Sequence, residues 1–85
     1  MAITAGQLRA ARALLKLEQR GLADATNVPV QTLKRYEGGV GPLTGNYQNI
    51  SSIVSYLENS GVVFLEHDET GGPGVRLRGG EDAGA

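Results

Sequence analysis

The sequence predicts a mainly α domain of four helices that ends in a two-stranded β segment. Apolar residues recur at helical spacing over the first 60 positions, and prolines and glycines interrupt that spacing at a few points. From residue 62 onward the apolar residues are instead β-branched and aromatic. With 85 residues the chain has the length of one small domain with a marginal core, so association with a second copy would add stability.

Two helices are expected before the first turn. Thr4 is a good N-cap because its hydroxyl can accept a hydrogen bond from an otherwise unpaired amide, and the apolar spacing after it predicts a helix over residues 5–16. A shorter helix is expected over residues 18–26, with Leu22 on its apolar side. Asn27 should end it, because asparagine adopts the left-handed conformation more readily than most residues.

A third helix is expected over residues 30–37. Pro29 has its backbone angle preset for a first helical turn and has no amide hydrogen to lose there. Gly38 and Gly39 should end this helix, and the glycine-rich stretch 38–45 should form a loop.

The fourth helix has the clearest pattern. Asn46 is a plausible N-cap, and Gly61 can provide a left-handed stop. Between them, one apolar stripe is formed by Ile50, Ile53, Val54 and Leu57.

A hairpin is expected after the fourth helix, with strands at 62–66 and 75–78. An isolated two-stranded ribbon is barely stable in water, so these strands should either pack on the helices or pair with strands of a second chain. We therefore divide the chain into a helical domain (1–60), a hairpin extension and possible dimer contact (61–78), and a disordered tail (79–85).

Charge is distributed unevenly. The formal net charge is -1, but residues 1–45 hold six basic and three acidic side chains, a net charge of +3. Residues 46–85 hold two basic and six acidic side chains, a net charge of -4. Any surface that faces phosphate is therefore expected in the first half.

Several classes of function are disfavoured by composition. Without cysteine, the chain can form no disulfide and no thiolate zinc site, and His67 is the single histidine, so we expect no metal and no cofactor. The residues that could act as acids or bases are expected to lie in a solvated hairpin loop: Glu66, His67, Asp68 and Glu69. The serines have no identifiable general base, so we expect no enzyme. No apolar run approaches the roughly 18 residues of a membrane span, and no signal peptide is evident, so we expect a cytoplasmic protein that does not enter membranes.

The segment 19–37 resembles the helix-turn-helix of the phage-repressor-like, or XRE, family of transcriptional regulators. Gln19 stands where that family opens its second helix, Leu22-Ala23 follow three positions on, and Asn27 lies at the turn. Arg35-Tyr36-Glu37 matches the end of the family's recognition helix. The resemblance covers residues 4–57 and implies a four-helix phage-repressor-like fold. Glu18, Gly21 and Pro29 depart from the usual pattern.

DNA contacts are expected on the third helix, which a short turn sets at a steep angle for entry into the major groove. Gln31 can pair with an adenine edge, Arg35 can form a bidentate pair with guanine, and Val30 can touch a thymine methyl group. Thr32 and Lys34 belong to the same expected site, and the resemblance implies that Gln19 holds phosphate. It also implies a partly buried structural ion pair between Arg12 and Glu37.

The expected function is therefore that of a sequence-specific transcriptional regulator, such as a repressor, that binds double-stranded DNA as a homodimer. The alternative is an anti-activator or adaptor with the same fold that binds a regulatory protein, for example a transcription factor, instead of DNA. Net acidity and the departures at Glu18 and Pro29 motivate that alternative, whose contact surface would be exposed Val30 and Tyr36 or the strand 62–65. A third reading is a toxin-antitoxin or phage-type repressor partner that binds both DNA and a protein, through the third helix and the hairpin respectively.

Overall fold

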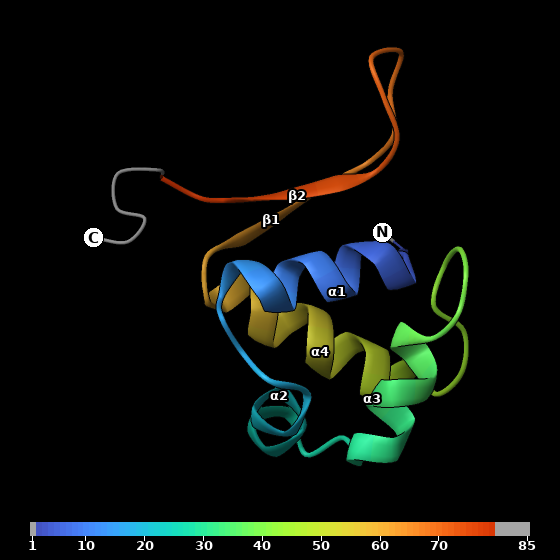
Figure 1. Ribbon diagram of the computed structural model, residues 1–85, viewed down its shortest axis with the longest axis vertical. Coiled ribbons are helices and arrows are strands. Elements are labelled where there is room, and N and C mark those ends of the chain that lie inside the picture. The colour runs from blue at the N-terminus through green and yellow to red at the C-terminus, as the bar shows by residue number, and fades with distance from the viewer. Residues whose placement is uncertain (1, 80–85) are drawn as a thin grey trace.

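The computed structural model describes residues 2–79 and contains four helices and one two-stranded antiparallel sheet. Helices α2 and α3 lie at one end of the molecule and the hairpin at the other, with α1 and α4 between them (Figure 1). Of the tail expected at 79–85, all but Gly79 lies outside the described residues. The elements are α1 (Ala5–Leu14), α2 (Gln19–Thr26), α3 (Val30–Glu37), α4 (Tyr47–Asn59), β1 (Val62–Leu65) and β2 (Gly74–Leu77).

Helix α1 begins at a reciprocal cap. The Gln7 amide donates to Thr4 Oγ1 at 3.0 Å, and the Thr4 amide donates to Gln7 Oε1 at 2.9 Å, which satisfies two amides that a helix start leaves unpaired. The helix ends at Leu14, two residues earlier than expected, because Lys16 adopts a left-handed conformation with φ of 57°. The Leu17 amide then donates to the Arg12 carbonyl and closes the turn toward α2.

Helices α2 and α3 meet at a three-residue turn. Asn27 has φ of 61°, which confirms the left-handed end predicted for the second helix, although that helix begins at Gln19 rather than residue 18. Val28 is buried and anchors the turn in the core. The bounds of α3 agree with the expectation. Tyr36, however, is only 4% exposed, so the expectation that it offers an exposed contact surface is wrong.

The connection from α3 to α4 is clamped against the start of the chain. The Ala5 amide donates to the Gly41 carbonyl at 3.0 Å, and the Leu43 amide donates to the Ile3 carbonyl at 2.9 Å. Asn46 then caps α4 by accepting from the Asn49 amide at 2.9 Å. The loop predicted at 38–45 is thus irregular but held at several points.

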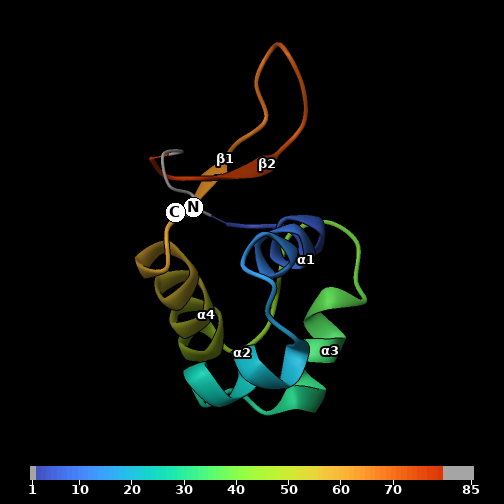
Figure 2. The ribbon, with the colours of Figure 1, turned by 60° about the vertical axis from the view of Figure 1, so that its left-hand side comes forward.

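The two strands pair within the chain. In the register Val62 faces Leu77 and Phe64 faces Val75, and these four side chains lie on the face that packs on the helices. Both strands end one residue earlier than expected, and β2 also begins one residue earlier, because Gly74 pairs with Leu65. Figure 2 shows the hairpin standing above α1 and α4.

One hydrophobic core joins the helices and the hairpin. Val62 and Phe64 belong to the same buried cluster as Leu8, Leu22 and Ile53, and Val75 and Leu77 pack against it, so the two strands share the core of the helices. Gln7 adds a polar link, because its Nε2 donates to the carbonyls of Leu65 and Gly74 at 2.9 and 3.0 Å. Among residues 2–79, no helix has both the length and the apolar character needed to cross a membrane.

Candidate nucleic-acid interface

Helix α3 has one buried and one exposed face. Leu33, Tyr36 and Glu37 are buried, and the helical repeat therefore turns Gln31, Lys34 and Arg35 outward. Val30 and Thr32 are half-buried at the two borders of that exposed face, and Val30 also packs against the core. The exposed face thus carries one amide and two cations.

The start of α2 adds charge beside α3. A hollow of about 240 Å³ lies between the two helices, and Glu18, Gln19, Arg20, Val30 and Lys34 line it. Arg20 and Lys34 are exposed there and can attract a phosphate oxygen, whereas the exposed Glu18 carboxylate opposes that attraction. Two cations and one anion leave a net positive rim.

Gln19 has an inward partner that the sequence did not reveal. Its side chain is half-buried, and its Nε2 donates to Glu37 Oε1 at 3.1 Å. The side-chain amide expected on phosphate is therefore engaged with the end of α3. Gln19 lies at the first position of α2 and is one of the residues that line the hollow.

Glu37 is the centre of a polar cluster that fixes the end of α3. Arg12 Nε and Nη2 donate to the two Glu37 carboxylate oxygens at 2.8 and 3.0 Å, and Arg12 Nη1 donates to the Leu17 carbonyl at 2.9 Å. The Glu37 side chain is 4% exposed and that of Arg12 is 23% exposed. The hydrogen bond to Glu37 raises the pKa of Arg12 against the opposing effect of burial. Arg9, which sequence reasoning did not include, also donates to the Glu37 main-chain carbonyl.

Tyr36 fixes α3 from a second side. Gly45 lies against the Tyr36 ring, where a Cβ placed on Gly45 would be 3.3 Å from both Cε1 and Oη of Tyr36. The backbone of Gly45 has φ of 134°, a conformation that favours glycine. The Tyr36 hydroxyl is buried without a hydrogen-bond partner among the described residues. The Arg35 guanidinium lies 5.2 Å from the centroid of the Tyr36 ring, so a cation on the exposed face is attracted to a buried aromatic group.

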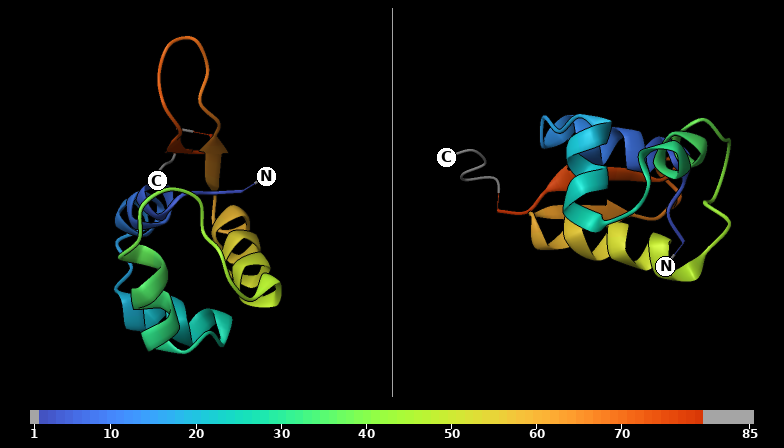
Figure 3. Two further views of the ribbon diagram at one scale, coloured as in Figure 1. Left: turned by 90° about the vertical axis from the view of Figure 1, so that its right-hand side faces the viewer. Right: turned by 90° about the horizontal axis from the view of Figure 1, so that it is seen from below.

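Acidic residues gather at the opposite end of the molecule. The hairpin connection carries Glu66, Asp68 and Glu69, all exposed, and it projects away from α2 and α3 (Figure 3). The Thr70 hydroxyl and amide donate to Asp68 Oδ1 at 2.6 and 2.8 Å, and these bonds lower the pKa of Asp68. The connection is therefore acidic, whereas Arg76 on β2 and Arg78 just after it are exposed cations at the same end of the molecule.

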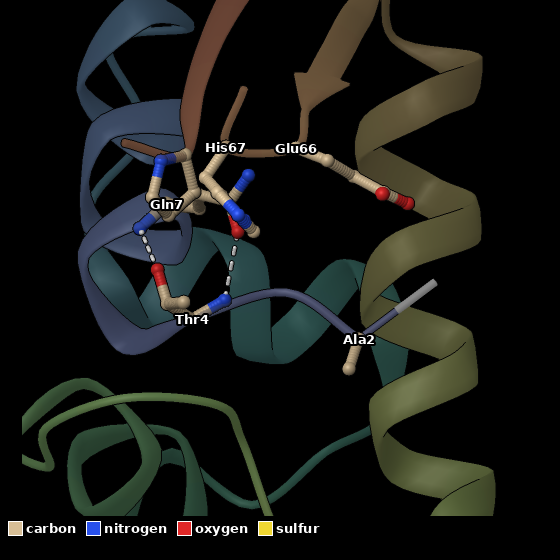
Figure 4. A pocket seen from close by; sticks show the side chains of 6 residues that line it. Ala2, Thr4, Gln7, Glu66 and His67 are labelled. Carbon is tan, nitrogen blue, oxygen red and sulfur yellow. Dashed lines mark hydrogen bonds between the residues drawn. The ribbon is translucent and has the colours of Figure 1, made fainter. Parts of the chain in front are cut away.

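A second hollow, of about 300 Å³, lies where the hairpin connection meets the start of α1. Thr4, Gln7, Glu66 and His67 are among the residues that line it, and Figure 4 shows the two hydrogen bonds between Thr4 and Gln7 with Glu66 extending away from them. Among residues 2–79, no three His, Cys, Asp or Glu side chains are placed so that they could hold a metal ion together. The polar groups of Gln7 are used to join α1 to the hairpin.

Comparison of the chain with models of known protein families and with curated protein sequences found no match.

Proposed function

We propose that this protein is a sequence-specific regulator of transcription that binds duplex DNA, with α2, the turn at 27–29 and α3 acting as a helix-turn-helix. The observation that supports this most directly is the exposed face of α3, where Gln31, Lys34 and Arg35 stand on a helix whose other face is buried. A fixed helix that presents base-reading side chains to solvent is what major-groove recognition requires.

The residue types on this face suit different parts of DNA. Gln31 can pair with an adenine edge and Arg35 with a guanine edge, while half-buried Val30 can touch a thymine methyl group. Lys34, together with Arg20 on α2, can bind phosphate oxygens and set the register. With eight residues, α3 is about 12 Å long, which a major groove about 12 Å wide can accommodate.

A homodimer completes the proposal. One eight-residue helix contacts few base pairs, whereas two copies related by a two-fold axis read two half-sites about 34 Å apart. The regulator then recognises a near-palindromic sequence, and the second half-site supplies affinity that one copy lacks.

The adaptor function has weaker support. Tyr36 is buried within the chain, and Val62 and Phe64 of β1 are in the core, so β1 can offer only the half-buried side chains of Val63 and Leu65. Such an adaptor would be folded and would bind no duplex DNA at any salt concentration.

The test is a selection from random duplex DNA, followed by affinity measurements from about 50 to 200 mM salt. The natural protein is compared with Gln31→Ala/Arg35→Ala and with a matched control, Gln48→Ala/Arg76→Ala, which removes the same residue types from exposed positions on α4 and β2. We expect the natural protein and the control to select the same sequence, with affinity that falls steeply as salt rises. The α3 variant should lose that preference while it keeps salt-dependent nonspecific binding.

Two results would contradict the proposal. The first is a folded natural protein that fails to bind DNA at 50 mM salt. The second is an α3 variant that selects the same sequence with the same affinity as the control, because the bases would then be read by another surface.

A further inference from the structure

The start of α4 borders an apolar hollow of about 460 Å³, which we call the Tyr47 groove. Among residues 2–79, none of the residues that line it has a charged side chain. Tyr47, the first residue of α4, lies beside this hollow and is 80% exposed. It is one of three large apolar residues that are exposed among residues 2–79. Its other lining residues include Ala2, Ile3, Leu43, Gly45 and Ile50.

The walls of the Tyr47 groove are held in place. The hydrogen bond from the Leu43 amide to the Ile3 carbonyl joins two of its sides, and the Asn46 cap fixes the start of α4. Gly45 packs against the Tyr36 ring of α3. The groove is thus preformed, which lowers the entropy cost of filling it.

We propose that a second copy of this chain docks here, with Tyr47 of each copy in the groove of the other. A projecting aromatic side chain and a hollow on the same surface are what a self-complementary two-fold contact needs. Near a two-fold axis each charged group approaches its own copy and is repelled, and the Tyr47 groove avoids this cost because it is uncharged. The outer face of the hairpin carries exposed Arg76 and is disfavoured for the same reason.

Position favours the same contact, and this step rests on the proposed function. The molecule measures 32 × 31 × 18 Å, and the hairpin lies at the end opposite to α3 (Figure 1). Contact through the hairpin ends would place a molecular length between the axis and each α3, whereas half-sites are about 34 Å apart in total. The Tyr47 groove adjoins α3 through Gly45 and Tyr36, so contact there keeps each α3 nearer to the axis than contact through the hairpin would.

The test is sedimentation equilibrium without DNA, over a range of concentrations, for the natural protein, Tyr47→Asp and Val63→Asp. Val63 lies on the outer face of the hairpin, so the second variant places the same charge at the rival contact. The exposed Tyr47 side chain contributes little to the core, and circular dichroism verifies that each variant is folded.

We expect a dimer for the natural protein, a Kd raised at least about tenfold for Tyr47→Asp, and an unchanged Kd for Val63→Asp. A monomeric natural protein, or a folded Tyr47→Asp variant with the natural Kd, would overturn the inference. Loss of the dimer in Val63→Asp alone would assign the contact to the hairpin. A dimer that depends on Tyr47 but binds no DNA would preserve the contact and refute the proposed function.

Discussion

Loss of Arg12 should destabilise the fold more than loss of Glu37, although the two residues form one ion pair. The Glu37 carboxylate is 4% exposed and accepts from Arg12 twice and from Gln19 once. In Arg12→Met this buried anion keeps only the neutral Gln19 amide, and removal of one partner of a buried pair costs about 3–5 kcal/mol. An 85-residue domain is stable by only about 4–13 kcal/mol, so this loss is a large fraction of the total.

Removal of Glu37 should destabilise the fold less than removal of Arg12. In Glu37→Met the charge left behind belongs to Arg12, which is 23% exposed and still donates to the Leu17 carbonyl. Its guanidinium can turn toward water, so we expect a cost of about 1–3 kcal/mol. Two apolar side chains leave no buried charge, and Arg12→Met/Glu37→Met should therefore cost no more than Arg12→Met alone.

Urea unfolding of the four proteins measures this cycle, with thermal unfolding as an independent readout. About 3 kcal/mol corresponds to a fall in Tm of more than about 10 °C for a domain of this size. Equal costs for the two single variants, or a double variant whose cost is the sum of the singles, would refute this prediction. Equal costs would mean that Arg12 is left as poorly solvated as Glu37, and additive costs would mean that the two residues act independently.

Two further predictions concern single polar groups. Tyr36→Phe should leave the free energy of unfolding unchanged or raise it by up to about 1 kcal/mol, because the buried hydroxyl has no hydrogen-bond partner among residues 2–79. Urea unfolding measures this, and a clear loss of stability would contradict the prediction and reveal a hydrogen bond to water. Asp68 should titrate below its ordinary pKa of 3.8, since the Thr70 hydroxyl and amide donate to its ionised form. A folded pKa below the unfolded one means that the turn is fully stabilised above pH 3.8 and loosens as pH falls through the lower value. NMR titration of the Thr70 amide should show this, and a midpoint at or above 3.8 would contradict it.

Features set by local chemistry could be predicted from the sequence. Thr4 and Asn46 cap helices because a short polar side chain reaches an amide three residues ahead, whatever the rest of the fold does. Asn27 takes the left-handed conformation in the position where a helix must end. The bounds of α3 follow from Pro29 before it and two glycines after it.

Features that depend on distant partners could not be predicted in the same way. Lys16 adopts a positive φ because the chain must turn sharply toward α2, and lysine itself gives no sign of this. Gln7 joins carbonyls that are 58 and 67 positions away, and Arg9 reaches the end of α3, so neither role has a local pattern. The sequence of the two strands is compatible with pairing within one chain or between two chains. In the structure they pair within the chain, and their inner faces share the core of the helices.

The end of α3 is the point where these long-range contacts converge. Arg9 holds the Glu37 carbonyl, Arg12 and Gln19 hold its carboxylate, and Gly45 lies against the ring of Tyr36. The start of α3 has apolar support from Val28 and Val30 but no side-chain cap, since Pro29 makes none. A helix held at both ends can present Gln31 on its exposed face while its direction stays fixed. Substitutions at Glu37 should therefore change the angle of α3, and under the proposed function they should weaken sequence-specific DNA binding even though that carboxylate is itself buried.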